Sequence, residues 1–180
     1  MKVLSLSIIC LVLSGCATLN EKECRSANWY QLGIRDGQSG DTEGLLDKHR
    51  EACKKYAVQP EENQYFSGRK EGLKEYCRYN NAFRLGLDGV SYKGTCPIDV
   101  DMKFRRYNDA ALEISRINRQ INEVNGKIAK EERELAKADN RKDRRELAAL
   151  NNKRDRLRND LFIQQREVDR LMNEAIALQR

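Results

Sequence analysis

Four cysteines, Cys24, Cys53, Cys77 and Cys96, have the residue type and spacing to form covalent cross-links in this chain of 180 residues. In an exported protein, an even set of thiols is typical of a disulfide framework, and four cysteines allow three pairings. We favour the sequential pairing, Cys24 with Cys53 and Cys77 with Cys96, because it closes the shortest loops. The alternative is a zinc site that includes His49, but the closely spaced CxxC pairs of zinc domains are missing. No metal or cofactor is therefore predicted.

The N-terminal residues indicate export. Lys2 is followed by an apolar run over residues 3–13, which is too short for a membrane-spanning helix of about 20 residues and is typical of a signal peptide. The run ends in the letters LSGC, with the cysteine at position 16. This ending resembles the bacterial lipobox, where a signal peptidase cuts before the cysteine and the thiol is acylated. We predict a signal peptide at 1–15 and lipidation of Cys16.

A lipidated Cys16 would anchor the protein to a membrane, since each buried lipid methylene contributes roughly 0.8 kcal/mol. Ala17 follows the cysteine, where lipoproteins retained in the inner membrane tend to have aspartate. The resemblance therefore implies an outer-membrane protein that faces the periplasm. The alternative is an ordinary signal peptide with a coincidental cysteine.

Acid–base chemistry has one candidate group, formed by Asp36, Asp41, Glu43 and His49. General acid–base catalysis needs paired titratable groups in a cleft. Here the residues lie in a chain that is 34% charged, where such neighbours arise by chance. We predict a protein that is not an enzyme; the alternative is a hydrolase that acts on the cell envelope, or an accessory subunit of one.

An aromatic residue three positions before a glycine occurs three times within the N-terminal half. The pairs are Tyr30 and Gly33, Tyr65 and Gly68, and Phe83 and Gly86. A phosphate-binding loop would end in GK[ST] after a strand, which none of them does. The glycines serve either close helix packing or turns. Both explanations stay open for Gly68 and Gly72, whereas turns are predicted at Gly37, Gly40, Gly86 and Gly89.

Four separated blocks, YQLGIRDGQSG, HREACKKYAVQP, YFSGRKEGLKEYC and NNAFRLGLDGVSYKGTCP, follow one another over residues 24–97. In this order they resemble a family of small bacterial lipoproteins classed as domain of unknown function 2799. The resemblance supports export and disulfide bonding. It implies no catalytic residues.

The C-terminal part, residues 101–180, has apolar residues at alternating steps of three and four, which predicts two coiled-coil helices. The pattern is interrupted by the polar run DNRKDRRE at 139–146, so we expect a turn there. Folding the helices antiparallel with Ala138 opposite Leu147 places Glu131 opposite Arg154. The alternative is a long helix that pairs between subunits.

The turn would carry four cations, Arg141, Lys142, Arg144 and Arg145. Residues 133–158 contain 10 Lys or Arg against 5 Asp or Glu, an excess that equals the whole excess of residues 17–180. We expect this tip to contact an anionic envelope component or a periplasmic protein. The alternative is a solvated helix end, and nucleic acid is not expected in this compartment.

The predicted fold is all-α. A lipidated linker at 16–23 leads to a disulfide-bonded helical head at 24–100, and a long antiparallel coiled-coil hairpin follows at 101–180. The expected role is a membrane-anchored interaction or scaffold protein of the cell envelope.

Overall fold

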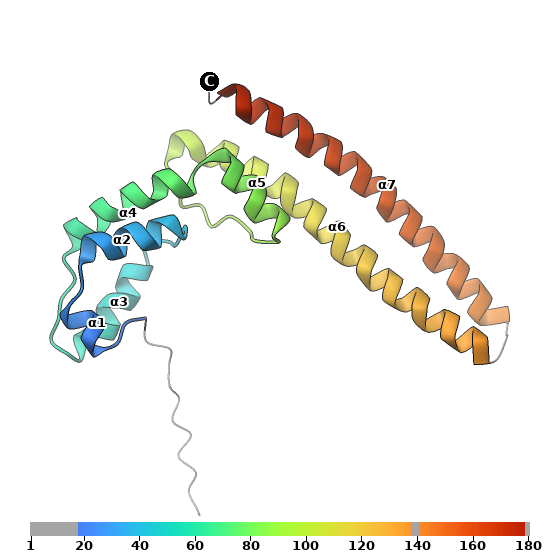
Figure 1. The fold of residues 1–180 in the computed structure, drawn as a ribbon, viewed down its shortest axis with the longest axis horizontal. Coiled ribbons are helices and arrows are strands. Elements are labelled where there is room, and N and C mark those ends of the chain that lie inside the picture. Colours follow the sequence, from blue (N-terminus) through green and yellow to red (C-terminus); the bar gives the residue numbers. More distant parts are fainter. Residues whose placement is uncertain (1–17, 138–140, 179–180) are drawn as a thin grey trace, which may run out of the picture.

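The chain folds into helices joined by short loops, with no strand in residues 18–137 and 141–178, the parts that the computed structural model describes. Figure 1 shows a bent molecule with a cluster of short helices at one end and a long helical hairpin at the other. The helices are α1 (Glu21–Arg25), α2 (Trp29–Gln38), α3 (Leu45–Lys54), α4 (Glu62–Tyr76), α5 (Tyr79–Leu87), α6 (Ile98–Lys137) and α7 (Arg141–Leu178). The predicted all-α fold with a hairpin is confirmed.

Helices α2 and α4 pack with their backbones in direct contact, because glycines line both sides of the contact. A Cβ atom on Gly33 would overlap the Tyr65 carbonyl oxygen and lie 2.8 Å from the Arg69 nitrogen. One turn further along α2, a Cβ atom on Gly37 would overlap the Arg69 carbonyl oxygen in the same way. A step of four residues along α2, from Gly33 to Gly37, thus moves the contact four residues forward along α4, so the two helices run in the same direction.

The glycines of α4 face α2 in turn. A Cβ atom on Gly68 would lie 2.8 Å from the Tyr30 carbonyl carbon, and one on Gly72 would lie 2.8 Å from the Gln38 nitrogen. For Gly68 and Gly72, the open choice between packing and turns is thus decided in favour of packing. The roughly 1 kcal/mol that each helical glycine costs relative to alanine is offset by the close approach of two helices.

The turns predicted at the other four glycines are correct at two positions and wrong at two. Gly40 and Gly89 lie in turns with φ angles of 68° and 80°, a region that favours glycine. Gly37 and Gly86 instead lie inside α2 and α5. Gly86 faces α6, where a Cβ atom would lie 2.7 Å from the Ala111 Cβ. The third aromatic–glycine pair therefore also serves helix packing.

The buried apolar residues form two cores. The first core lies among the four helices α1, α2, α3 and α4, around Trp29, Leu46 and Tyr65. The second joins the end of α4 to α5, the base of α6 and the end of α7, and its rings stack in pairs. Tyr76 lies 5.4 Å from Phe104, and Phe83 lies 5.0 Å from Tyr107, between ring centroids. The expected boundary between residues 100 and 101 falls in the first turn of α6, so head and hairpin share this core.

The two disulfides fasten one core each. Cys24 is bonded to Cys53 in the first core, and Cys77 is bonded to Cys96 beside the second. This is the sequential pairing favoured from the sequence. Because all four sulfurs are used in disulfides, these cysteines cannot serve as zinc ligands, and the described residues contain no group of three or more metal-ligating side chains.

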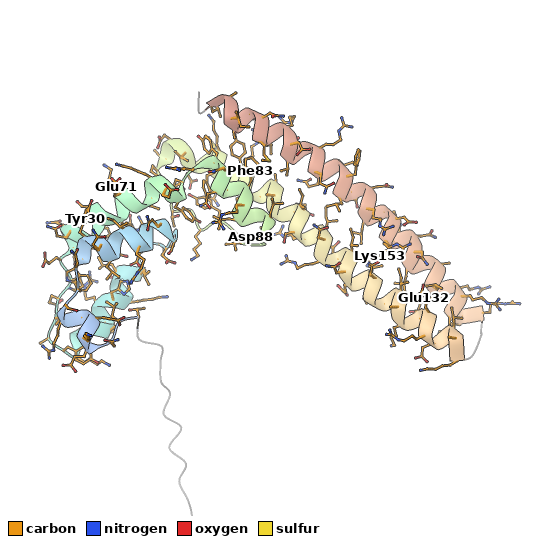
Figure 2. All side chains as sticks on the ribbon, viewed as in Figure 1. Tyr30, Glu71, Phe83, Asp88, Glu132 and Lys153 are labelled. Atoms are coloured by element: carbon orange, nitrogen blue, oxygen red, sulfur yellow. A yellow bond between two sulfur atoms is a disulfide. The ribbon has the colours of Figure 1, made fainter. Side chains whose placement is uncertain are left out.

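Helices α6 and α7 pack along their length as one hairpin, and side chains from both fill the space between them (Figures 1 and 2). With 40 residues at 1.5 Å per residue, α6 extends about 60 Å. Towards the base, the seam contains buried residues of both helices, namely Ile114, Ile117, Val124, Ile128, Val168, Leu171 and Ala175.

The predicted register of the hairpin is wrong by roughly two helical turns. Because α7 already begins at Arg141, the connection is shorter than the predicted polar turn. Tyr107 donates a hydrogen bond of 3.0 Å to Glu174, and Gln164 donates one of 3.0 Å to the carbonyl of Ala110 rather than lying opposite Ile121.

Further along the hairpin, the same shift separates the charges that were expected to pair. Arg154 is not paired with Glu131 in the described chain and lies 3.6 Å from Asp155 in its own helix. The pKa of the Glu123 carboxyl is lowered by its hydrogen bond with Lys127 and also by the charge of Lys153 across the hairpin. Ala138, which anchored the predicted register, lies outside the described residues.

Candidate functional site

Three polar side chains from three helices meet in the first core. Asp36 of α2 is 5% exposed and His49 of α3 is 3% exposed, while Tyr65 of α4 is fully buried. The His49 Nε2 atom lies 2.9 Å from Asp36 Oδ2, and the Tyr65 hydroxyl donates to the same oxygen over 2.9 Å. Burial, followed by the hydrogen bond to Asp36, raises the pKa of Tyr65. The phenol is therefore a neutral hydrogen-bond donor to a buried carboxylate.

The second ring nitrogen of His49 holds the start of the described chain. His49 Nδ1 lies 2.8 Å from the hydroxyl of Thr18, and the next residue, Leu19, is buried in the same core. Asn20 then accepts a hydrogen bond from the Glu23 nitrogen, and the Glu23 carboxylate accepts one from the Asn20 nitrogen, which starts α1 with a capping box. The chain is thus fixed to the head from Thr18 onward.

The four residues proposed from the sequence as an acid–base group separate into two places. Asp36 and His49 lie together in the buried cluster. Asp41 forms an ion pair of 3.0 Å with Lys93, and Glu43 lies 3.6 Å from Arg69. Chemically, the buried pair resembles the histidine–carboxylate half of a hydrolytic triad, with the exposed Thr18 hydroxyl in the third place.

Arg69 is a functional candidate that the sequence reasoning missed. It is 6% exposed, although it lies in a charged stretch between two glycines of α4. Its Nη2 donates a hydrogen bond of 2.7 Å to the carbonyl of Asp41. Arginine is rarely buried without a partner, so its burial is not expected from residue type. The sequence signal for this burial is its position between Gly68 and Gly72, because the glycine face of α4 is the packed face.

The basic tip lies at the far end of the hairpin from the head (Figure 1). Arg141, Lys142, Arg144 and Arg145 are exposed and form the first two turns of α7. The positive end of a helix dipole lies at the helix N-terminus, so these cations add to a positive field. Asp143 is the acidic residue within the first turn of α7. The structure therefore shows a charged helix start where a loop was expected.

Two further features of the sequence lie outside the described residues. The predicted signal peptide at 1–15 and the predicted lipidation site, Cys16, precede Thr18, the first described residue. Within residues 18–137 and 141–178, no helix has the length and apolar character needed to cross a membrane.

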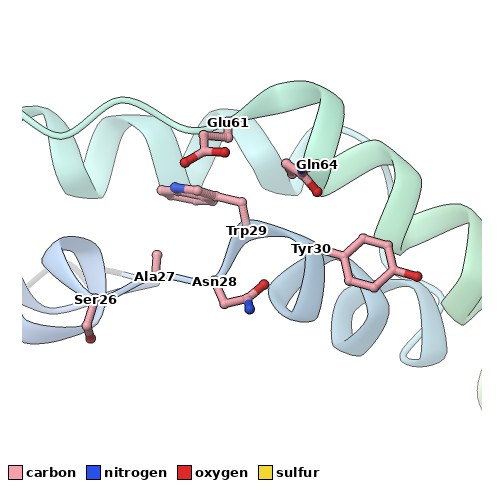
Figure 3. A pocket seen from close by; sticks show the side chains of 7 residues that line it. All are labelled: Ser26, Ala27, Asn28, Trp29, Tyr30, Glu61 and Gln64. Atoms are coloured by element: carbon pink, nitrogen blue, oxygen red, sulfur yellow. The ribbon is translucent and has the colours of Figure 1, made fainter.

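A surface hollow of about 510 Å³ lies at the start of α2, between it and the start of α4 (Figure 3). In this view Glu61 faces the ring of Trp29 across the hollow, and Tyr30 points away from them. Trp29 is 5% exposed and belongs to the first core, and the Asn28 side chain caps α2 by accepting from the Gln31 nitrogen. The Trp29 ring and the Asn28 side chain are thus already used by the fold.

These features define an all-helical, disulfide-bonded protein whose head continues into a long antiparallel hairpin. Residues 28–112 match the family model described as protein of unknown function (DUF2799), which confirms the resemblance of this part of the chain to that family. The match includes α2 to α5 and the base of α6 and ends before the distal hairpin. No curated protein and no solved structure matches the chain significantly.

Proposed function

We propose that this protein is a lipid-anchored interaction or scaffold protein of the bacterial cell envelope, which holds a basic hairpin tip away from the membrane. The observation that carries the proposal is an unbroken series of packed contacts from Thr18 to the hairpin. Thr18 binds His49, α2 packs on α4 through backbone contacts, and α4 shares a core with α5, α6 and α7.

This series has a mechanical consequence for an anchored protein. Cys16 lies two positions before Thr18 along the chain, a reach of at most about 7 Å. With acyl chains on Cys16, the head would lie close to the lipid surface, and the direction of the hairpin would follow from the head. A flexible tether would leave that direction undefined. The outer membrane, facing the periplasm, is the location that Ala17 favours.

The tip supplies the recognition element of the proposal. Its four cations lie about 60 Å along α6 from the head end, on a helix start whose dipole adds to their field. A positive, projecting surface of this kind attracts anionic envelope components, such as lipid headgroups or wall polymer, or the acidic face of a periplasmic protein.

Photo-crosslinking in intact cells tests the proposal. A photoreactive residue at Arg145 should capture a reproducible envelope partner, and one at the exposed Asn159, further along α7, should not. Replacing Arg141, Lys142 and Arg144 with glutamine should abolish capture by the photoreactive residue at position 145. Replacing all four cations with glutamine should weaken the binding of purified protein to anionic vesicles or wall fragments at low salt. Unchanged binding of the glutamine variant would refute the role of the tip.

A second candidate is a hydrolase that acts on envelope components, or an accessory subunit of one. It is favoured by the alignment of the Thr18 hydroxyl, His49 and Asp36 through two hydrogen bonds. In that role Thr18 would be the nucleophile and His49 the base. Turnover of wall material that is lost in both Thr18→Val and His49→Ala, while the protein stays folded, would support it. Unchanged turnover in these variants would exclude it.

A further inference from the structure

Arg69 is a buried cation whose hydrogen-bonding capacity is incompletely used. Its Nη1 atom lies 3.6 Å from the carboxylate of Glu43, a side chain that is 74% exposed. Its Nε atom is buried and has no hydrogen-bond partner within the described chain. A guanidinium has five N–H donors, and buried donors are nearly always satisfied. The Arg69 guanidinium therefore has a donor left for an additional acceptor.

A cavity of about 550 Å³ adjoins this arginine. It lies between α4 and the segment that follows α5, and we call it the Arg69 pocket, lined among others by Glu43, Phe66, Arg69, Lys70, Thr95 and Pro97. In Figure 1, the end of α4 lies beside the start of α6, to which this segment leads. The volume is in the range of sites for small organic ligands, about 300–1,000 Å³.

A second polar atom at the same cavity has no hydrogen bond of standard geometry in the described residues. The Oγ1 atom of Thr95 lies near the Tyr76 phenol but is buried without a hydrogen bond of standard geometry in the described residues. Thr95 and Arg69 belong to segments 26 residues apart, and the Cys77–Cys96 disulfide holds the Thr95 segment against the end of α4. Two residues with unused hydrogen-bonding capacity, one from each segment, therefore line one cavity.

The charges at the pocket favour a ligand with a single negative charge. Arg69 and Lys70 supply two positive charges, and Glu43 supplies one negative charge. The two cations exceed the one carboxylate by a single charge, so a monocarboxylate leaves the site neutral, whereas a dianion leaves an excess negative charge beside Glu43. Phe66, which is 39% exposed, and Pro97 provide apolar surface beside the charged groups.

We propose that the Arg69 pocket binds a small monocarboxylate with an apolar body. The carboxylate lies against Arg69 and Lys70 and accepts a hydrogen bond from the Thr95 hydroxyl. The apolar body contacts Phe66 and Pro97. Arginine pairs well with carboxylates because its planar N–H groups match the two oxygens. This binding depends on neither lipidation nor the hairpin tip.

Nuclear magnetic resonance of the full chain in detergent tests the proposal with phenylacetate as the probe. Phenylacetate should saturably shift the Arg69 Nε–H and Thr95 amide resonances at pH 7, and the neutral phenylacetamide should not. Equal shifts with both compounds would overturn the carboxylate assignment, and no shift at millimolar phenylacetate would overturn the site. Stronger binding of the dianionic phenyl phosphate would overturn the charge argument.

Two rim variants keep the test independent of folding. Glu43→Gln should tighten phenylacetate binding by about threefold, because a competing carboxylate is removed, and Lys70→Ala should weaken it by about threefold. Lys74→Ala is the matched control, since Lys74 is exposed on the same helix and pairs with Glu71. Identical affinities in all three variants would contradict the proposed position of the ligand.

Discussion

Gly68 of α4 lies directly against the backbone of Tyr30 in α2, so that a single added methyl group would overlap the Tyr30 carbonyl oxygen. Gly72, Gly33 and Gly37 make the corresponding contacts along the same interface. Four small residues thus allow two parallel helices to approach closely, although both helices carry charged residues on their outer faces. Such an interface has little room to adjust, because backbone atoms cannot move aside as side chains can.

Gly68→Ala should lower the free energy of unfolding by about 3 kcal/mol, the upper end of the usual cost of over-packing. The matched control is Gly126→Ala in α6, where a Cβ atom meets nothing within 4 Å. That variant should gain about 1 kcal/mol from helix propensity. Urea denaturation followed by circular dichroism measures both values, and equal stabilities would contradict the backbone contact.

His49→Leu should cost about 3 kcal/mol, because Asp36 would lose one of its two buried hydrogen-bond partners. Thr18→Val removes the exposed hydroxyl at the other ring nitrogen and should cost about 1 kcal/mol or less. Thermal unfolding of the two variants beside the unmodified protein gives the comparison. If His49→Leu were as stable as the unmodified protein, the cluster would not hold α2 and α3 together.

Each disulfide should contribute about 3 kcal/mol, since the bonds close loops of 29 and 19 residues. The double variant Cys77→Ser with Cys96→Ser should loosen the segment around Tyr92 and leave the first core protected. Hydrogen exchange followed by mass spectrometry would show this as faster exchange near residue 92. Peptide mapping of the unreduced protein checks the pairing itself, and a Cys24–Cys77 peptide would contradict it.

Stability should fall as the pH rises above about 10, the ordinary tyrosine pKa. Burial and a hydrogen bond to Asp101 raise the pKa of Tyr92 to about 12, and burial and a hydrogen bond to Glu174 raise the pKa of Tyr107 to about 12. Between these values the unfolded chain has lost phenolic protons that the folded chain keeps, so the unfolded state is favoured. The stability contributed by both groups is complete below pH 10 and lost through pH 12.

Urea titrations from pH 8 to pH 11, with phenolate absorbance as a second signal, test this dependence. Tyr107→Phe is the informative control, because it removes the titrating hydroxyl and keeps the ring that stacks on Phe83. The variant should show a shallower decline above pH 10. A decline as steep as that of the unmodified protein would exclude Tyr107 as a contributor.

Several features could be predicted from residue type and local spacing. The heptad pattern indicated two long helices, and the spacing of the four cysteines favoured the pairing that closes the shortest loops. Turns at Gly40 and Gly89 were also predicted correctly, because a positive φ angle is a local property of the backbone. The hairpin register was not predicted correctly. A heptad pattern repeats every two turns, so it is satisfied equally well after a shift of one repeat.

The remaining features depend on residues that are distant in the sequence. Gly37 and Gly86 look like turn residues until another helix lies against them, and Arg69 looks like a surface cation until the glycine face of α4 is buried. His49 and Asp36 were proposed together, but Tyr65 and Thr18 joined them only through the packing of three helices. Local propensity and periodicity therefore determined the long helices and the glycine turns, whereas burial, which requires all the elements at once, decided which polar side chains could act together.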